Sequence, residues 1–409
     1  MRADSRITIR PWRISVGALL AFLFLFAAVP LAHAADTVVS LEFDDATADQ
    51  AAARSMLASR NMHATFFVNS GTIGAASGFH LSWDQLHDLA ADGNEITGHT
   101  VNHVNLPQAQ SDLDEARREI CDDRSTLLRE GFDVRNFAFP YGAYDATTKQ
   151  LAADCGYNSA RDVSGVYDPV RCDDCPYAET IPPRDPFRTR TTENVEATTA
   201  LAEIQASVTA AEQSGGGWVQ IVLHHICSGC GQRYSITQSD FAALLDWLAA
   251  RPVTTSVKTV QEVIGGPLKP AVAGPAPTPP SGPNLVRNPS VENADVNGNP
   301  TCWDPVGFGN NSASFTRTTD SHSGLYAERL AVTNYVSGAQ RMFVHMDLGR
   351  CAPTVTAGNN YTIGAYYKST ARPAFEVYVR DSRGLWRWWM TTASFDPATS
   401  WDRATFTTP

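Results

Sequence analysis

Four polar segments in the sequence each follow an apolar, strand-like run, and they hold the residues best suited to metal or acid–base chemistry. In chain order they are Asp44-Asp45, the HTVNH segment from His99 to His103, Pro140-Tyr141-Gly142 and His224-His225. One carboxylate and two imidazoles supply an oxygen and two nitrogens, a ligand set that suits Zn²⁺ and leaves a position open for water. A second carboxylate could take a proton from that water, since a metal lowers its pKa to about 7. A histidine across the pocket could protonate a leaving group. Together these residues predict metal-assisted hydrolysis of an acyl bond.

Each segment taken alone also has a structural interpretation. An Asp-Asp pair after a strand is often a turn or a helix N-cap. Two histidines four residues apart can be solvated neighbours on one helix face. A His-His pair at a buried strand end is commonly structural. The chemical interpretation therefore depends on whether the fold brings the four segments together.

The elements that must position these residues alternate between strand and helix. Apolar or β-branched runs predict strands at 37–43, 63–69, 95–98, 136–139, 157–161 and 218–223, with helical stretches that include 48–59, 111–130 and 241–250. Such alternation predicts parallel strands joined by helical crossovers, and both an open doubly wound sheet and a closed β/α barrel fit it. In either architecture the carboxyl ends of the strands share one face, so the four polar segments should converge there.

The ordered set LEFDDA, HTVNH, FAFPYGAYD and IVLHHI resembles the motifs of the polysaccharide deacetylase family, the NodB-homology carbohydrate esterases. The resemblance spans about residues 36–266 and implies a distorted β/α barrel. It implies that Asp45, His99 and His103 hold a divalent metal, with Zn²⁺ the expected ion, and that Asp44 is the general base. The backbone N–H of Tyr141 would stabilise the oxyanion together with the metal.

Three positions depart from the family pattern. Ala46 stands where the first motif usually ends in glycine, which alters turn freedom but removes no reactive group. Ala138 stands where an arginine usually orients the base, and we predict that Arg161, at the end of the next strand, supplies that charge.

The late histidine is also ambiguous. Strict Leu-x-His alignment selects His225, whereas the family's usual His-Asp step selects His224. Strand alternation allows only one of the two side chains to enter the pocket, and we favour His224 as the acid.

The N-terminus has the pattern of an export signal over residues 1–35. Four arginines precede a short apolar run at 16–29, and Ala32-His33-Ala34 forms a small-x-small cleavage site. Residues 1–34 carry four arginines and one aspartate, so their removal changes the formal charge from −11 to −14. A chain this acidic argues against nucleic acid or an anionic membrane as partner. We predict a secreted, extracellular protein with a neutral polysaccharide partner and no membrane contact after cleavage.

Eight cysteines in an exported chain predict disulfides rather than metal ligands. The pairs Cys172/Cys175 and Cys227/Cys230 could suggest a zinc ribbon, but they lie too far apart for the usual spacing of about 15–20 residues. We predict that these pairs fix loops at the rim of the site. Cys302 and Cys351 should pair, because a linker isolates them from the rest.

A Pro-rich segment at 267–283 divides the chain into a catalytic domain at 36–266 and a second domain at 284–409. The segment should be an extended, semi-rigid spacer. The second domain is rich in turn residues and short strands, which predicts an all-β sandwich of the jelly-roll kind. Its opening, NLVRNPS followed by Trp303, resembles a carbohydrate-binding module, and Trp386, Trp388 and Trp389 could offer flat faces to sugars. The chain stops where such modules usually continue, so we expect a truncated sandwich.

These observations predict a secreted hydrolase that removes acetyl groups from an N-acetylated polysaccharide such as chitin, peptidoglycan or poly-N-acetylglucosamine. An O-acetyl (xylan) esterase with the same site, or a non-catalytic glycan-binding protein, are the alternatives. The sequence leaves the glycan, the native metal and the oligomeric state open.

Overall fold

A computed structural model describes residues 36–109, 112–279 and 283–409 of the chain. The predicted export signal at 1–35 lies outside these ranges. Within them, no helix is both long and apolar enough to cross a membrane.

The first domain is built on an eight-stranded sheet in which every pairing is parallel. Its strands are β1 (Thr37–Phe43), β2 (Thr65–Val68), β3 (Glu95–Gly98), β4 (Asn136–Ala138), β5 (Ser159–Gly165), β6 (Thr189–Thr191), β7 (Gly217–Leu223) and β10 (Thr255–Val257). Neighbours run in chain order from β1 to β6, and β7 pairs with β1 along its whole length. After β6, the N–H groups of Thr192 and Val195 donate to carbonyls of Gln220 and Val222 on β7. The sheet therefore curls into a distorted β/α barrel, as predicted.

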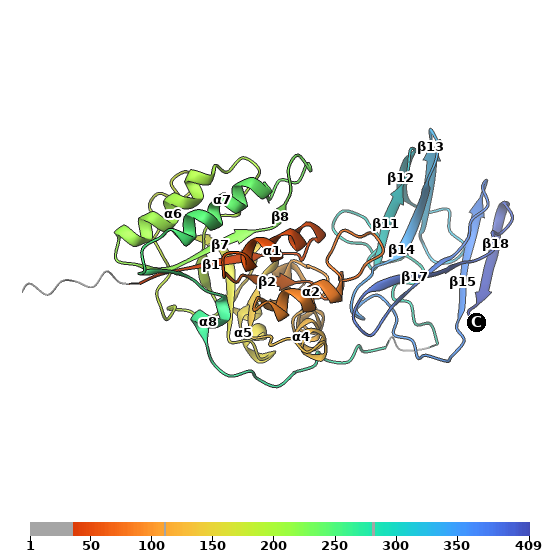
Figure 1. The fold of residues 1–409 in the computed structure, drawn as a ribbon. Coiled ribbons are helices and arrows are strands. Elements are labelled where there is room, and N and C mark those ends of the chain that lie inside the picture. Colours follow the sequence, from red (N-terminus) through yellow and green to blue (C-terminus); the bar gives the residue numbers. More distant parts are fainter. Residues whose placement is uncertain (1–35, 110–111, 280–282) are drawn as a thin grey trace, which may run out of the picture. The chain divides into compact units, whose positions relative to one another are not determined.

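Helices cover the outside of this sheet (Figure 1). They are η1 (Ala48–Ala52), α1 (Ala53–Ala58), α2 (Trp83–Ala91), α3 (Leu106–Ala109), α4 (Leu113–Arg129), η2 (Pro140–Gly142), α5 (Ala146–Asp154), α6 (Leu201–Gln213), α7 (Gln238–Ala249) and α8 (Val260–Ile264). The rings of Phe43 and Phe66 stack with centroids 4.9 Å apart, and Phe241 of α7 packs edge-on against Phe43. Because both faces of β1 are covered, all of its residues are buried.

Local sequence signals begin and end the helices. Ser82 and Gln85 form the predicted capping box of α2, and Gly93 follows that helix with a φ of 93°. The side chain of Asp112 accepts a hydrogen bond from the N–H of Glu115 and so caps α4.

The Pro-rich segment has no helix or strand between residues 267 and 279, but its first part is not a free spacer. The guanidinium of Arg124 on α4 donates to the carbonyls of Lys269 and Pro270, at 2.7 and 2.9 Å. The N–H of Gly274 donates to Asp122 at 2.8 Å. A Pro-rich segment has few backbone N–H donors but keeps its carbonyl acceptors, and polar side chains of a helix can donate hydrogen bonds to them. The segment is therefore fixed to the first domain through about residue 274.

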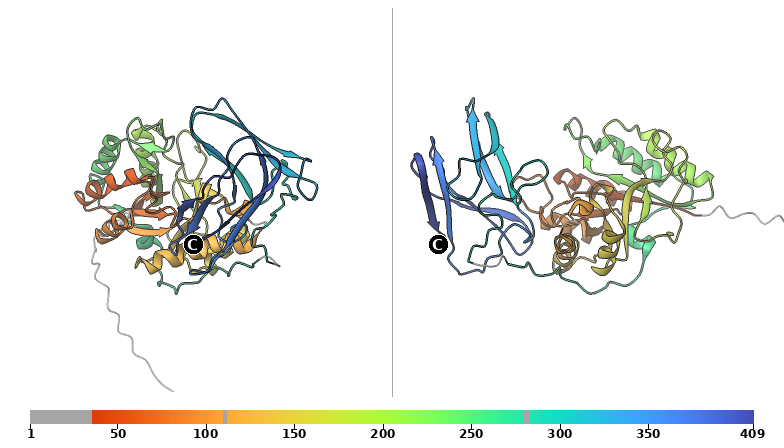
Figure 2. Two further views of the ribbon diagram at one scale, coloured as in Figure 1. Left: turned by 90° about the vertical axis from the view of Figure 1, so that its right-hand side faces the viewer. Right: turned by 180° about the vertical axis from the view of Figure 1, so that it is seen from behind.

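The C-terminal region consists of antiparallel strand pairs, with no helix among residues 283–409 (Figure 2). The pairs are β11 (Trp303–Phe308) with β14 (Ala339–Val344), β12 (Ser312–Thr318) with β13 (Ala327–Thr333), β15 (Thr362–Ser369) with β18 (Ala398–Thr407), and β16 (Glu376–Arg380) with β17 (Trp386–Thr391). This confirms the predicted β-sandwich. Cys302 and Cys351 form the predicted disulfide. Trp388 and Trp389 are 59% and 39% exposed.

Candidate active site

The four polar segments meet at the carboxyl ends of the barrel strands. Asp44 and Asp45 follow β1, His99 follows β3, η2 follows β4, and His224 separates β7 from β8 (His225–Ile226). The N–H of Asp44 donates to the carbonyl of Leu223 at 3.0 Å, which ties the end of β1 to the end of β7. Parallel strands therefore bring together residues that lie up to 180 positions apart in the chain, as the alternating pattern predicted.

Asp45, His99 and His103 form one compact cluster. Oδ1 of Asp45 lies 3.2 Å from Nε2 of His103 and 3.5 Å from Nε2 of His99. The three ligating atoms all lie within 4.8 Å of one another. Oδ1 of Asp45 is buried and has no hydrogen-bond partner among the described residues. Burying a carboxylate oxygen without a hydrogen-bond donor is unfavourable unless a positively charged group lies beside it.

The hydrogen bond on the far side of His99 fixes the tautomer of its ring. Nδ1 lies 2.8 Å from the carbonyl oxygen of Ala138, which can only accept, so Nδ1 carries the proton. In the neutral ring Nε2 then presents its lone pair to Asp45. Histidines that bind metals are oriented in the same way by a partner on the other nitrogen. Lone pairs of nitrogen and oxygen that converge with no proton between them fit a cation, so these residues fit a divalent metal.

The electrostatics of Asp45 and His103 agree with a role as ligands. Burial would raise the pKa of Asp45, but positive charge on the neighbouring His99 and His103 rings holds it well below its usual range. Burial and the neighbouring His99 lower the pKa of His103 to about 4. Near neutral pH, Asp45 is therefore an anion and His103 a neutral imidazole with a free lone pair, and these are the forms in which both residues bind metals.

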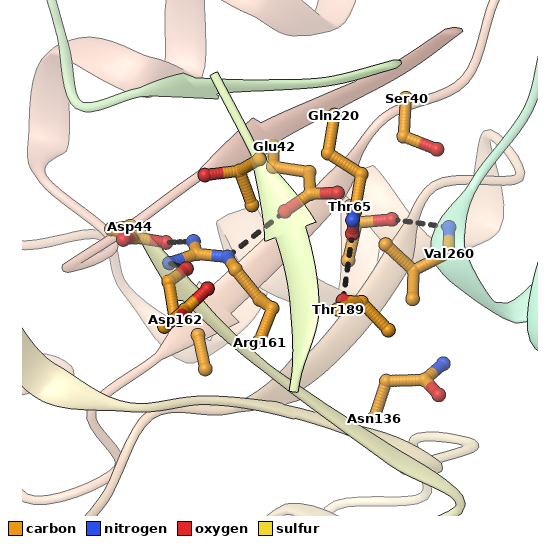
Figure 3. Close-up of polar contacts among 12 residues, drawn as sticks. Ser40, Glu42, Asp44, Thr65, Asn136, Arg161, Asp162, Thr189, Gln220 and Val260 are labelled. Atoms are coloured by element: carbon orange, nitrogen blue, oxygen red, sulfur yellow. Dashed lines mark hydrogen bonds and ion pairs between the residues drawn. The ribbon is translucent and has the colours of Figure 1, made fainter. Parts of the chain in front are cut away.

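Asp44 lies in a buried ion-pair network that supports it as a base. Nη2 of Arg161 binds Oδ1 of Asp44, and Nε of Arg161 lies 3.0 Å from Glu42 (Figure 3). Burial would raise the pKa of Asp44, but the charges of Arg161, His99 and His224 together outweigh burial and lower that pKa. Arg161 is the register partner of Ala138 on the neighbouring strand. A guanidinium from β5 therefore lies beside Asp44, and its role in orienting the base stays a prediction.

The two late histidines point to different partners. Nε2 of His224 lies 3.9 Å from Oδ2 of Asp44, and its ring stacks on Tyr234 with centroids 5.1 Å apart. Nδ1 of His225 instead lies 2.7 Å from Oδ2 of Asp49. Successive side chains at a strand end point to opposite sides, which separates the two rings. The structure thus brings His224, and not His225, to the carboxylate of Asp44.

The backbone around the site is unusual. Five residues other than glycine have a positive φ here: Asp45 (70°), Ala46 (50°), Thr100 (70°), His103 (55°) and Tyr141 (60°). Such conformations are uncommon outside glycine and concentrate at functional sites. Tyr141 is 68% exposed, and its ring packs against His103 with centroids 4.5 Å apart. No sequence pattern predicts these left-handed residues.

Sequence reasoning also missed Gln50, a fully buried residue of η1. Its Nε2 donates to the carbonyls of Asp44 and His224, at 2.6 and 2.9 Å. One amide group thereby joins the backbone after β1 to the backbone after β7. The stretch at 48–59 also holds Asp49, Arg54 and two serines, so no sequence signal singles out Gln50.

All eight cysteines are paired, and the two CxxC segments each close on themselves. The remaining bridges are Cys121–Cys155 and Cys302–Cys351, beside Cys172–Cys175 and Cys227–Cys230. Two further clusters of ligand-type residues, around Asp49 with His225 and around Asp174, include disulfide-bonded cysteines. Because a disulfide sulfur is not a thiolate ligand, the structure favours disulfides over the zinc-ribbon alternative.

Comparison with known proteins gives a family match within the first domain. Residues 32–160 match the family model described as polysaccharide deacetylase. An uncharacterized protein of Streptomyces coelicolor is 35% identical over 126 residues, which cover 30% of this chain and 46% of that protein. The chain thus spans about half the length of this relative.

Two solved deacetylases are similar in structure. The Streptococcus pyogenes deacetylase PplD in complex with acetate has 27% identity and a TM-score of 0.30, over 33% of this chain and 59% of that chain. The peptidoglycan deacetylase PdaC from Bacillus subtilis has 18% identity and a TM-score of 0.34, over 56% of this chain and 90% of that chain.

Proposed function

We propose that this chain, whose residues 32–160 match the polysaccharide deacetylase family model, is a secreted, metal-dependent hydrolase that removes acetyl groups from a neutral N-acetylated polysaccharide. Glycans of the chitin, peptidoglycan or poly-N-acetylglucosamine type are the proposed substrates. One observation carries the proposal: Asp45, His99 and His103 converge on a cation-sized site beside a second buried carboxylate, Asp44.

Asp45, His99 and His103 would hold the metal, most suitably Zn²⁺ for this oxygen and two nitrogens. A bound divalent ion would polarise the acetyl carbonyl and acidify a water molecule. The same ligand set accepts other divalent ions, so availability as well as geometry decides the native metal. The hydrogen bond from His99 to Ala138 keeps the ring turned to the site before any ion arrives.

Asp44 is the proposed general base. Its pKa lies below the usual range because the charges of Arg161, His99 and His224 together outweigh burial, so the carboxylate is ionised and can accept a proton near neutral pH. Its free oxygen, Oδ2, faces His224 and not Arg161. Asp44 would take a proton from the attacking water and keep it oriented.

His224 is the proposed acid for the departing amine. Its ring lies on the side of Asp44 away from the ion pair with Arg161 and is held flat against Tyr234. A proton on this ring would pass to the nitrogen of the amide as the carbon–nitrogen bond breaks. The exposed Tyr141, whose backbone is left-handed and whose ring packs against His103, would donate its N–H to the oxyanion.

Secretion and glycan binding by the second domain belong to the same proposal. Four disulfides and a strongly acidic chain support an extracellular protein that binds a neutral partner. Trp388 and Trp389 on β17 are exposed and would offer their ring faces to sugars.

The test is acetate release from N-acetylglucosamine oligomers and, in parallel, from acetylated xylan. Each substrate is tried with the protein as purified, after chelation, and after zinc is restored. Release that stops on chelation and returns with zinc supports the proposal and identifies the bond that is cleaved. Metal binding without release from either substrate would contradict it.

A further inference from the structure

The segment from His99 to His103 carries two of the three proposed metal ligands but belongs to no helix or strand. Thr100 and His103 within it have left-handed backbone conformations. A segment with such dihedrals does not keep its shape by local preference, because left-handed conformations are unfavourable for these residue types. Contacts from elsewhere must therefore hold it in the form that binds a metal.

Asp123 of α4 supplies one such contact. Its side chain is completely buried, and its Oδ2 accepts a hydrogen bond from the N–H of His99 at 3.1 Å. The same N–H also donates to the carbonyl of Val68. Oδ1 accepts the N–H of Ser70 at 2.9 Å. One carboxylate therefore joins the residue after β3 to the loop after β2.

Glu119, one turn earlier on α4 and also completely buried, binds the other end of the segment. Oε2 accepts the N–H of Asn102 at 2.9 Å, and Oε1 accepts the side-chain amide of Asn102 at 2.7 Å. The backbone carbonyl of Glu119 accepts the N–H of Val101 at 3.1 Å. Residues four apart lie on one face of a helix, so both carboxylates reach the segment side by side.

These carboxylates do not act as ordinary ion-pair partners. Among the described residues, neither Glu119 nor Asp123 forms a salt bridge, whereas the buried Glu42, Asp44 and Glu115 each pair with an arginine. Gly98 allows their close approach, since a Cβ atom there would lie 2.8 Å from Oδ2 of Asp123. The helix is thus packed against the end of β3 so that buried carboxyl oxygens meet backbone donors.

We infer that Glu119 and Asp123 are positioning residues that hold the segment from His99 to His103 ready to bind the metal. They touch neither ligand ring and act through the backbone. This inference rests on the proposed metal centre. Partners of this kind, one shell beyond the ligands, typically change metal affinity by about 10- to 100-fold when they are replaced.

The test measures the zinc dissociation constant of the full-length, metal-free protein by competition with a chromophoric chelator. Glu119→Gln and Asp123→Asn each replace one acceptor oxygen by an amide that can only donate. We expect zinc to bind about 10- to 100-fold more weakly in each variant. The melting temperature of the metal-free protein is measured in parallel, because a purely structural role would change that value alone.

Glu95→Gln is the matched control. Glu95 is also a buried carboxylate of the barrel, but its partners are Thr65, Asn136 and the N–H of Gln261, outside the metal segment. We expect this variant to lower the melting temperature while zinc affinity stays at the wild-type value. The inference is overturned if Glu119→Gln and Asp123→Asn bind zinc like the wild type, or if Glu95→Gln weakens zinc as much as they do.

Asn102→Ala provides a second test if Glu119→Gln or Asp123→Asn does not fold. Asn102 is partly exposed, and its removal takes away the bond to Oε1 of Glu119 from the side of the segment. We expect zinc to bind several-fold more weakly, and unchanged affinity would again overturn the inference. His103→Ala marks the affinity of a broken site. If the wild-type protein binds zinc no better than His103→Ala, the proposed metal centre itself is refuted. If the wild type binds zinc well and all positioning variants bind it equally well, only the inference about Glu119 and Asp123 is overturned.

Discussion

Replacing Arg161 tests whether a cation on β5 holds the proposed base. Arg161 is only 1% exposed, and its guanidinium spans two buried carboxylates, Asp44 and Glu42. Lysine in its place keeps one positive charge but cannot reach both carboxylates with a planar fork. Arg161→Lys is therefore the informative substitution, because it keeps the positive charge but removes the planar group that binds both carboxylates.

The expected loss follows from the contacts that disappear. A hydrogen bond to a charged group contributes about 1.5–3 kcal/mol, and each 1.36 kcal/mol corresponds to a tenfold change in rate. If the lost bond is the one that fixes Asp44, kcat should fall by about 10- to 150-fold. Arg161→Ala leaves both carboxylates buried without a cation and should also lower the free energy of unfolding by about 3–5 kcal/mol.

The assay measures kcat and KM for acetate release separately, together with the melting temperature of each variant. Glu42→Gln is the control, because its amide oxygen can still accept from Nε of Arg161 while Asp44 keeps its own contact. It should lower kcat much less than Arg161→Lys does. Folded Arg161→Lys and Arg161→Ala proteins with wild-type kcat would refute the role of Arg161. Equal losses in Arg161→Lys and Glu42→Gln would show instead a general effect of the buried network.

Three further predictions follow from the site and the barrel. His224→Ala should lower kcat by about 10²- to 10⁴-fold, whereas His225→Ala, whose ring pairs with Asp49, should lower it less than tenfold in initial-rate measurements; equal losses would contradict the assignment of the acid. Zinc at 100 times its dissociation constant should stabilise the protein against urea by about 2.7 kcal/mol, and His103→Ala should abolish this gain. Burial raises the pKa of Glu95, so the folded protein keeps a proton that the unfolded chain releases above its ordinary pKa of about 4.3. The free energy of unfolding should therefore fall as pH rises above this value, and it should fall less steeply in Glu95→Gln. If urea unfolding from pH 4 to 8 gives the same pH dependence for both proteins, the reasoning is wrong.

Much of the barrel could be predicted because its strands are short apolar runs. β1 and β3 occupy the predicted residues without change, and β2, β4 and β7 differ only at their ends. β6 could not be found in this way, since its sequence Thr-Arg-Thr is polar. It is a strand because the barrel needs a partner for β5, and its Thr189 contacts Gln220 inside the barrel. That requirement comes from the closed sheet and not from the local sequence.

The site was predictable in its residue types but not in its supports. Asp45, His99 and His103 follow strands in a recognisable order, and the position of Arg161 at the end of a neighbouring strand suggested its partner. The bridge made by Gln50 depends on backbone carbonyls far away in the chain. Contacts of this kind carry no periodicity, so only the folded structure reveals them.

The left-handed residues at the strand ends also bear on how many mutations this protein can tolerate. Each such residue other than glycine costs about 1–3 kcal/mol, while whole proteins are typically stable by only about 5–15 kcal/mol. Five of them surround the site, among them Ala46, which directly follows Asp45. The barrel therefore carries strain comparable with an ordinary margin of stability. During evolution or laboratory selection, gains in activity that add strain at these strand ends will require compensating stabilisation elsewhere in the barrel.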